Sequence, residues 1–266
     1  MQIKKAGKVH YIESGKLAAA GVSVHGFTTR HEGVSRHPYN SLNLGANTFD
    51  SPHNVQGNRS ILARAFGARA EQLLTVTQVH GTDLLVIDSP NPDYTHFLKL
   101  ECDGLITNQP GIMIGICVAD CIPILLLDPV KKVVAALHAG WKGTAGEIAM
   151  KGVEALVNIF NANPEEILAG IGPGIKSCCY EVDSVVRDAF NKNGAKWDHY
   201  AKETAPGRWG LDLAEANCSQ LLAAGLTEAN IDSTPFCVSC EHDLFFSFRR
   251  EGGETGRQMG FVMLLD

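Results

Sequence analysis

The run from Gly111 to Thr144 constrains the fold of this chain more than any other stretch. It consists mostly of apolar residues, interrupted by short breaks at which a chain can turn, and it predicts three buried strands in succession. Cys121 follows an acidic break before the middle strand, and His138 stands at the close of the last strand. The stretch therefore presents one thiol and one imidazole at strand ends.

A second imidazole, His80, closes another β-rich run and precedes a glycine. Taken singly, a histidine or a cysteine in such a position is more often a core or surface residue than a ligand. Together, His80, Cys121 and His138 supply three of the four positions of a tetrahedral zinc ion and leave one open, as a catalytic site requires. We therefore predict a zinc site here, whose ligands also suit copper. Asp83 or Asp120 is expected to orient an imidazole or to act as an acid or base.

Composition limits the range of partners. The 266 residues are 45% hydrophobic, enough for a large core, and we expect a single domain over residues 1–266. A formal net charge of -6, with scattered basic residues, argues against a nucleic-acid or membrane partner and favours small molecules. Neither a signal peptide nor a membrane-spanning stretch is recognisable, so a cytoplasmic location is expected. The eight cysteines would then be free thiols, core residues or metal ligands.

Hydrophobic periodicity and turn residues predict the order of the elements. Strands outnumber helices and occur in consecutive groups, which favours an α+β fold over a doubly wound sheet. A polar loop over residues 31–50 is long enough to be functional or disordered. The other expected elements are a strand at 22–30, a helix at 54–66, a hairpin of strands at 73–80 and 84–87, a helix starting near Thr144, a strand at 167–172, helices at 182–190 and from 211, and a closing pair of strands at 244–249 and 259–265.

A second group of cysteines competes as a metal site. Cys237 and Cys240 are separated by two residues, a spacing that zinc ligands often have. A structural zinc site needs a second pair at suitable spacing, and the chain offers only the adjacent Cys178 and Cys179. On spacing alone, structural zinc is not expected there.

A series of motifs resembles one known family and covers nearly the whole chain in order. The motifs are FTTR at 27–30, SLNLG at 41–45, TQVHG at 77–81, CDGL at 102–105, VADCIP at 118–123, HAGWKG at 138–143, GIGP at 170–173, FSFRR at 246–250 and TGRQ at 255–258. In this order they are similar to the YfiH-type laccase-domain family. The resemblance implies an α/β/β/α layered domain with mixed sheets. It also implies a zinc ion bound by two histidines and one cysteine, which fall here on His80, Cys121 and His138.

The resemblance carries more than one functional label. It implies a purine nucleoside phosphorylase that also cleaves methylthioadenosine and deaminates adenosine, while an older label names polyphenol oxidases. A multicopper oxidase needs many histidines, commonly in His-x-His pairs, and this chain has ten histidines but no such pair. Zinc with an open position instead lowers the pKa of bound water to about 7, which suits adenosine deamination. The expected catalytic residues are then His80, Cys121 and His138.

Phosphorolysis adds the requirement that polar and cationic groups hold the substrates. Arg30, Arg59, Lys142 and Arg249 are the candidates for phosphate, and Lys142 stands close to an expected helix start, where anions bind. Asn43 is a further expected substrate contact. With the family resemblance, these residues predict a zinc-dependent purine nucleoside phosphorylase for adenosine, inosine, guanosine and methylthioadenosine, with adenosine deamination as a second activity. The expected partners are nucleoside and phosphate, and the expected state is a monomer or homodimer.

Other functions stay open at this point. Cys121 near His138 or His80 would also suit a thiolate nucleophile in a cysteine amidase, and some relatives of the family are linked to the correction of mis-assembled peptidoglycan precursors. A copper-dependent polyphenol oxidase is another alternative. Finally, a filled coordination shell would make the chain a metal-binding or partner-binding protein without catalysis.

Overall fold

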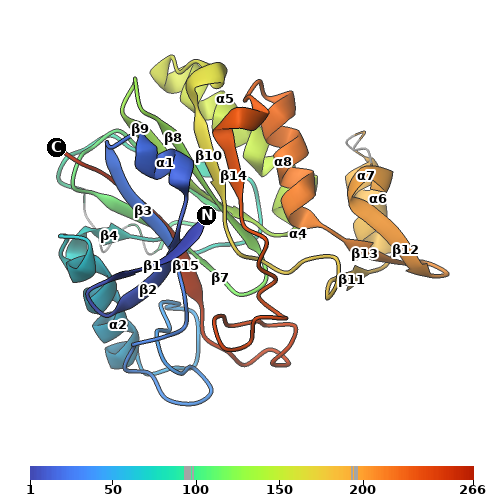
Figure 1. Ribbon diagram of the computed structural model, residues 1–266, viewed down its shortest axis with the longest axis horizontal. Coiled ribbons are helices and arrows are strands. Elements are labelled where there is room, and N and C mark those ends of the chain that lie inside the picture. Colours follow the sequence, from blue (N-terminus) through green and yellow to red (C-terminus); the bar gives the residue numbers. More distant parts are fainter. Residues whose placement is uncertain (93–96, 98, 193, 195–196) are drawn as a thin grey trace.

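The computed structural model describes residues 1–92, 97, 99–192, 194 and 197–266, and strands in this part of the chain form three sheets (Figure 1). Sheet 1 has the order β1 (Gln2–Ala6), β2 (Val9–Glu13), β3 (Ser23–Thr28), β15 (Gln258–Leu264), β7 (Met113–Val118) and β4 (Leu73–Leu74). Sheet 2 has the order β14 (Ile231–Ser233), β10 (Leu168–Ile171), β8 (Ile122–Asp128), β9 (Val133–Ala139), β6 (Gly104–Thr107) and β5 (Leu84–Ile87). Sheet 3 is smaller, with the order β11 (Glu181–Val182), β13 (Arg208–Leu211) and β12 (Ala201–Ala205).

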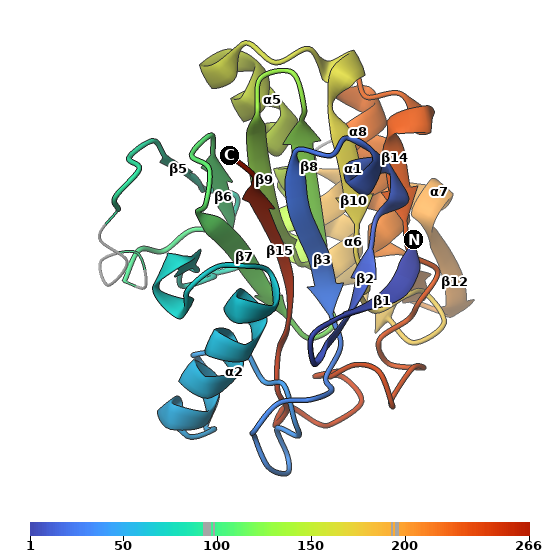
Figure 2. The ribbon, with the colours of Figure 1, turned by 60° about the vertical axis from the view of Figure 1, so that its left-hand side comes forward.

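Helices in the described residues lie mainly on the outer faces of the two large sheets. They are α1 (Gly15–Ala19), α2 (Pro52–Ala65), α4 (Trp141–Ala145), α5 (Ile148–Phe160), α6 (Ser184–Asn191), α7 (Trp197–Tyr200) and α8 (Leu213–Ala223), with short 3-10 turns at Ala70–Gln72, Pro164–Glu166 and Glu228–Asn230. Figure 2 shows α2 on the side of sheet 1 and α5 with α8 on the side of sheet 2.

Three apolar clusters hold these layers together. One cluster packs α2 on the outer face of sheet 1, a second fills the space between sheets 1 and 2, and a third packs α5 and α8 on the outer face of sheet 2. The order from one outer face to the other is therefore helix, sheet, sheet, helix. This arrangement confirms the predicted α+β fold with α/β/β/α layers and mixed sheets.

The predicted three-strand run is confirmed as β7, β8 and β9. Within β8, Ile124 and Leu126 point into the cluster with the helices, whereas Leu125 and Leu127 point into the cluster between the sheets. Strand β9 alternates in the same way. Because both faces of sheet 2 are covered, most positions of β8 and β9 are apolar, which explains the continuous run in the sequence.

The pairing of β8 with β9 brings the predicted ligands to one end of sheet 2. The strands are antiparallel, with Ile122 opposite Ala139 and Pro123 opposite His138. Cys121 directly precedes β8, so its side chain lies at the same end of the hairpin as His138.

The predicted hairpin of strands 73–80 and 84–87 is wrong. Its first part contains only the short strand β4, which pairs in parallel with β7 in sheet 1. Its second part, β5, pairs in parallel with β6 in sheet 2. Because β4 and β5 belong to different sheets, residues 75–83 cross from one sheet to the other, and His80 lies on this crossing. The alternation of apolar residues indicates an extended chain but does not identify the strand that pairs with it.

The predicted strand at 244–249 is also absent, and the segment is a buried loop. Phe245 and Phe246 are fully buried, but their backbone groups bond to side chains and to a turn of the same segment instead of a β ladder. For example, the backbone N–H of Phe246 donates to Gln258 Oε1 at 2.9 Å. Only the second strand of the predicted pair exists, as β15 between β3 and β7.

The helix predicted to start near Thr144 is divided into two. The first part, α4, already begins at Trp141, and the second, α5, begins at Ile148. Glu147 between them has a backbone φ of 65°, which a continuous helix does not allow. Lys142 on α4 is exposed, and its Nζ lies 5.6 Å from the centroid of the Trp141 ring.

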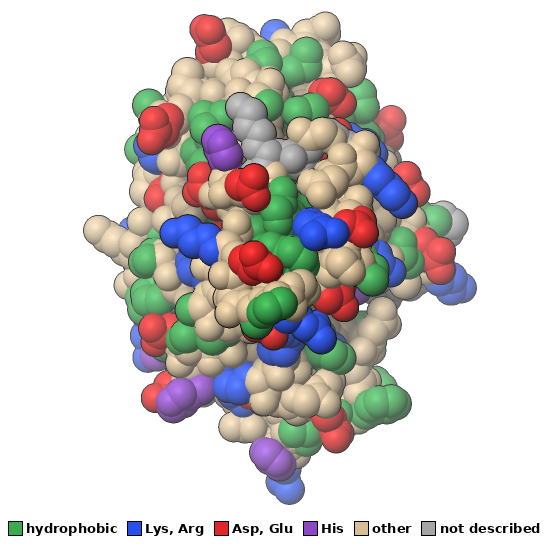
Figure 3. All heavy atoms as spheres, turned by 90° about the vertical axis from the view of Figure 1, so that its right-hand side faces the viewer, with side chains coloured by type: hydrophobic (Ala, Val, Ile, Leu, Met, Phe, Trp, Pro, Cys, Tyr) green, Lys and Arg blue, Asp and Glu red, His purple; other side chains and the backbone are tan. Residues whose placement is uncertain are grey.

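Sheet 3 packs through aromatic rings against α6 and α7. The ring centroids of Phe190 and Trp197 are 5.5 Å apart, and those of Trp197 and Trp209 are 6.1 Å apart. Figure 3, which views the molecule from the right-hand side of Figure 1, shows basic and acidic side chains interspersed on that face.

Candidate active site

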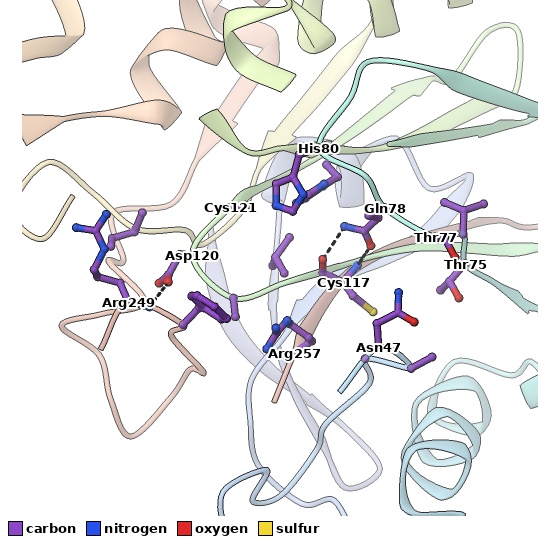
Figure 4. Close-up of a pocket in the computed structure, with 18 of the residues that line it drawn as sticks. Asn47, Thr75, Thr77, Gln78, His80, Cys117, Asp120, Cys121, Arg249 and Arg257 are labelled. Atoms are coloured by element: carbon purple, nitrogen blue, oxygen red, sulfur yellow. Dashed lines mark hydrogen bonds between the residues drawn. The ribbon is translucent and has the colours of Figure 1, made fainter. Parts of the chain in front are cut away.

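A cavity of about 510 Å³ lies at the end of the central strands, where Cys121 and His138 line it. Figure 4 shows Cys121 and His80 on its wall. This volume is within the range of roughly 300–1,000 Å³ that is usual for small-molecule sites. The residues that line it are Gly45, Ala46, Asn47, Arg59, Thr75, Val76, Thr77, Gln78, His80, Cys117, Val118, Ala119, Asp120, Cys121, His138, Ile175, Tyr180, Phe248, Arg249 and Arg257.

His80, Cys121 and His138 converge on this cavity from three separate segments. The ligand atoms that they offer, one sulfur and one nitrogen from each imidazole, all lie within 4.8 Å of one another. The centroids of the two imidazole rings are 4.8 Å apart. Gly140 leaves the space that this convergence needs, because a Cβ atom there would lie 3.0 Å from both the Cys121 sulfur and the His80 ring.

Asp103 fixes the position of both imidazole-bearing segments. Its buried carboxylate accepts a hydrogen bond from His138 Nδ1 at 2.7 Å. It also accepts from the backbone N–H groups of His80 at 2.9 Å and Gly81 at 2.6 Å, where His80 has a backbone φ of 61°. Because Nδ1 of His138 is engaged by the carboxylate, Nε2 is the nitrogen left to face Cys121, as is usual for metal-bound histidines.

The carboxylates predicted for this orienting role lie elsewhere, and the role falls to Asp103 instead. Asp83 is exposed. Asp120 lines the cavity, but its carboxylate accepts hydrogen bonds from Ser247 Oγ and the backbone N–H of Arg249, both at 2.6 Å. Burial raises the pKa of the Asp120 carboxyl against the effect of these bonds. Asp120 therefore anchors the loop that carries Arg249.

Cys121 and His138 form an ion pair when no metal is bound. Burial alone would raise the pKa of the Cys121 thiol, but the charge of His138 and hydrogen bonds with His138 and His80 outweigh it and lower the pKa to about 6. Burial likewise opposes a charge on His138, but the Cys121 thiolate and the bond to Asp103 raise its pKa to about 9. Between these two values the pair is a thiolate and an imidazolium, and the thiolate is the form that binds metals or attacks electrophiles.

This pair leads to a prediction on pH dependence. In protein stripped of metal, alkylation of Cys121 by iodoacetamide is expected to reach half its maximal rate near pH 6, because the depressed pKa keeps the thiolate above that pH and loses it below. Timed alkylation followed by peptide mass spectrometry measures this rate. Cys102 is the internal control, since burial raises its pKa to about 11. A midpoint for Cys121 above about pH 8, as in a free cysteine, would contradict the ion pair.

Arginines form the cationic part of the cavity. Of the residues predicted to bind substrate, Arg59 and Arg249 line it, and Arg257 joins them. Arg59 Nη2 donates to Thr75 Oγ1 at 2.7 Å. Arg257 Nη1 donates to the carbonyl oxygens of Thr255 at 2.7 Å and of the following residue at 3.0 Å. Such guanidinium groups suit phosphate, because they present several donors in a fixed plane.

The other predicted substrate-binding residues are not among the described residues that line the cavity. Arg30 faces a separate hollow and forms an ion pair with Glu251 at 3.2 Å. Asn43 is fully buried, and its Oδ1 accepts from the backbone N–H of Arg257 at 2.9 Å, so it positions that arginine. Lys142 is exposed on α4. The structure thus brings two of the five predicted residues to the cavity.

Arg257, Gln78 and two aromatic residues also line the cavity, although the sequence did not predict them. The Gln78 side chain exchanges two hydrogen bonds with the backbone of Cys117, at 2.8 and 2.9 Å, and so attaches the crossing segment to β7. The guanidinium of Arg249 lies 5.1 Å from the Tyr180 ring centroid, and that of Arg257 lies 5.6 Å from the Phe248 ring centroid. Three of these residues stand within the motifs TQVHG, TGRQ and FSFRR, but no local signal identifies Tyr180 as part of a site.

The three converging residues fit a single metal ion. Zinc bonds of about 2.0–2.3 Å place tetrahedral ligands roughly 3.3–3.8 Å apart, which is compatible with donor atoms that all lie within 4.8 Å. The lowered pKa of Cys121 favours the thiolate that a metal requires, and the bond from His138 Nδ1 to Asp103 leaves Nε2 to face the ion. Thiolate and imidazole ligands suit zinc or copper.

A layered α+β fold with a His-Cys-His cluster at the wall of such a cavity defines a protein that binds small molecules beside a candidate metal site. The chain belongs to the family described as multi-copper polyphenol oxidoreductase laccase, whose sequence model matches residues 24–265. The predicted YfiH-type family is thereby confirmed.

Relatives with known names cover nearly the whole chain. A purine nucleoside phosphorylase, YlmD, of Geobacillus stearothermophilus is 38% identical over 90% of this chain and 89% of its own length. A purine nucleoside phosphorylase of Deinococcus radiodurans is 40% identical over 93% of this chain and 92% of its own length. An adenosine deaminase of an unknown prokaryotic organism is 37% identical over 86% of this chain and 89% of its own length. These names support an enzyme.

Solved structures also match the fold over nearly the whole chain. The crystal structure of YlmD from Geobacillus stearothermophilus has a TM-score of 0.92 and 35% identity and covers 99% of this chain and 98% of its own. That of the hypothetical protein YfiH from Bacillus licheniformis has a TM-score of 0.91 and 34% identity over 99% of both chains. Within the described ranges, no helix combines the length and the apolar character needed to cross a membrane.

Proposed function

We propose that this protein is a zinc-dependent purine nucleoside phosphorylase that also deaminates adenosine. The observation that carries the proposal is one cavity that combines the donor atoms of His80, Cys121 and His138 with the guanidinium groups of three arginines. A metal site beside a phosphate site is what the two activities require. The relatives named purine nucleoside phosphorylase and adenosine deaminase support the two activities. The proposed nucleosides are adenosine, inosine, guanosine and methylthioadenosine.

The roles of the residues follow from their places in the cavity. His80, Cys121 and His138 hold the metal, and Asp103 keeps His138 in the required orientation. Zinc bound there supplies a Lewis acid and water whose pKa is lowered to about 7. For phosphorolysis, Arg59, Arg249 and Arg257 hold phosphate against the ribose.

The aromatic residues complete the proposed binding site. Tyr180 and Phe248 line the cavity, and each lies beneath the guanidinium group of an arginine. A flat purine ring gains stacking energy against such side chains. We therefore propose that the base stacks on a face of these rings that no arginine covers, while Arg249 and Arg257 stay available for phosphate.

Metal removal tests the proposed function. Treatment with a chelator is expected to lower phosphate-dependent release of hypoxanthine from inosine at least about a hundredfold, because the metal contributes several kcal/mol to such reactions. Added zinc is expected to restore the rate. The measurement is hypoxanthine formation with and without phosphate, together with metal content by elemental analysis. Unchanged phosphorolysis in protein shown to contain no metal would refute zinc dependence.

The phosphate site is tested by substituting Arg257. Arg257→Gln is expected to raise the KM for phosphate about tenfold or more, since a hydrogen bond to a charged group contributes about 1.5–3 kcal/mol. Arg64→Gln is the matched control, because Arg64 is exposed on α2 away from the cavity lining. Arg30→Gln tests the candidate in the separate hollow. If Arg30→Gln raised the KM for phosphate and Arg257→Gln did not, the phosphate site would lie in the hollow at Arg30 and not in the cavity.

A cysteine amidase is the second candidate, and one observation favours it. The pKa of Cys121 is lowered to about 6 beside His138, which is the state of an activated nucleophile. The predicted substrates of such an enzyme are mis-assembled peptidoglycan precursors. If metal-free protein hydrolyses an amide substrate and alkylation of Cys121 stops it, the amidase is supported. If activity instead disappears on chelation, the phosphorylase is supported.

We propose one domain over residues 1–266, small-molecule partners, a monomer or homodimer and a cytoplasmic location. Copper in place of zinc is the alternative for the His80, Cys121 and His138 site, and with it a polyphenol oxidase activity. Elemental analysis of the purified protein distinguishes the two metals.

A further inference from the structure

Four cysteine side chains meet in a second cluster, separate from His80, Cys121 and His138. Cys178 and Cys179 precede β11, and Cys237 and Cys240 follow β14. Although the two pairs are at least 58 positions apart in the sequence, their sulfur atoms all lie within 4.8 Å of one another. We infer that Cys178, Cys179, Cys237 and Cys240 bind one zinc ion, at a structural site separate from His80, Cys121 and His138.

The sulfur separations agree with tetrahedral coordination by thiolates. Cys240 Sγ lies 3.4 Å from Cys179 Sγ and 3.7 Å from Cys178 Sγ. A zinc ion with bonds of about 2.3 Å to four sulfurs places them roughly 3.8 Å apart. A set of four soft sulfur donors selects zinc among the common divalent ions, whereas calcium and magnesium prefer oxygen. The geometry therefore requires little movement to enclose an ion.

The backbone around Cys237 is arranged as a turn that supports a thiolate. The N–H of Cys240 donates to the carbonyl oxygen of Cys237 at 3.1 Å, which folds the two cysteines toward each other. The N–H of Lys176 donates to Cys237 Sγ at 3.4 Å. Hydrogen bonds to sulfur stabilise its charged form, as in metal-bound thiolates. Arg250 Nη1 donates to the carbonyl oxygens of Val238 at 2.6 Å and Ser239 at 3.2 Å, so a cation also stands beside this turn.

A second turn brings the adjacent cysteines, Cys178 and Cys179, to the sulfurs of Cys237 and Cys240. The N–H of Cys179 donates to the carbonyl oxygen of Lys176 at 2.9 Å, and that of Tyr180 bonds to the same oxygen at 2.9 Å. Gly174 and Cys237 form an isolated parallel bridge that holds the two segments side by side. Spacing in the sequence did not anticipate this site, because adjacent cysteines do not by themselves form a usual ligand pair.

A disulfide explains the arrangement less well than an ion. The sulfurs of Cys178 and Cys179 lie at similar distances from that of Cys240, so neither is selected as its disulfide partner. All four thiols are free. A single disulfide would use only two of the four sulfurs, whereas one zinc ion uses all four.

The ion would fasten two segments that form the cavity wall. Tyr180 directly follows Cys179, and Ile175 stands just before the turn that carries the pair; both line the cavity. The Cys237 segment leads into the loop with Phe248 and Arg249, which also line it. With four protein ligands the ion has no open position, so its role is to hold this wall in place.

Zinc content tests the inference. Protein produced with zinc is expected to lose one zinc per chain in the double variant Cys178→Ser/Cys240→Ser, measured by elemental analysis against protein concentration. Cys218→Ser is the control, since Cys218 lies on α8 outside both cysteine clusters, and it should lose none. In the Cys121→Ala background the same double substitution should again remove one zinc, so the result does not depend on the proposed function.

A second measurement guards against a double variant that fails to fold. Cobalt added to metal-free Cys121→Ala protein, with all four cluster cysteines intact, is expected to give the strong thiolate-to-cobalt absorption of a four-sulfur site, and zinc is expected to abolish it. Equal zinc content in the double variant and its parent would overturn the inference. So would iron as the only metal at the cluster, or the absence of thiolate-to-cobalt absorption, or a disulfide among these cysteines in protein prepared with zinc.

Discussion

Replacement of Cys121 by alanine is expected to empty the His80, Cys121 and His138 site and to lower phosphorolysis of inosine roughly a thousandfold or more. The metal contributes several kcal/mol to such chemistry, and each 1.36 kcal/mol is about tenfold in rate. Without the thiolate, only two imidazoles remain among the three converging ligands. The substitution also lowers the pKa of His138, because the charge of the Cys121 thiolate is the main factor that raises it. Both the metal and the ion pair depend on this one sulfur.

The variant should keep its fold, because Cys121 lies between β7 and β8 and is only half-buried. Circular dichroism and the melting temperature check this in metal-free protein. Cys218→Ala is the matched control, since it removes a half-buried thiol far from the cavity lining. If pure Cys121→Ala protein still releases hypoxanthine from inosine at the parental rate, the assignment of the site is wrong.

Replacement of Phe27 by alanine is expected to lower the free energy of unfolding by about 3–5 kcal/mol, a large share of the roughly 5–15 kcal/mol of a typical domain. Phe27 on β3 is 1% exposed and belongs to the cluster between sheets 1 and 2. Glycines make room for its ring. A Cβ on Gly172 would overlap the ring, and one on Gly260, which is opposite Phe27 in the β ladder, would lie 3.1 Å from it.

Because neighbouring backbone lies directly against the ring, little can move to fill the cavity left by its removal. Urea unfolding at equilibrium measures the effect. Phe49→Ala provides the matched control, since that side chain is 94% exposed, and its unfolding free energy should change by less than about 0.5 kcal/mol. A loss below about 1 kcal/mol for Phe27→Ala would show that the two sheets repack around the gap.

The candidate metal ligands could be predicted from the sequence, whereas the residues that position them could not. His80, Cys121 and His138 stand at recognisable strand ends or turns in quoted motifs. Asp103 stands in a motif as well, but nothing local distinguishes it from Asp83 or Asp120 as the partner of His138. Its carboxylate reaches that imidazole because β6 pairs with β9, a contact between residues 35 positions apart. Tyr180 enters the cavity in the same way, through packing of distant segments.

The sequence by itself determined the three buried strands and the chemical types of the ligands. Burial on both faces requires apolar residues at most positions, and a thiol or imidazole at a strand end can be recognised without knowledge of its partner. Only the tertiary structure decided that β4 and β5 belong to different sheets and that four distant cysteine sulfurs meet. The physical reason is that strand partners and ligand clusters depend on free energies of contact between remote segments, which local periodicity does not encode.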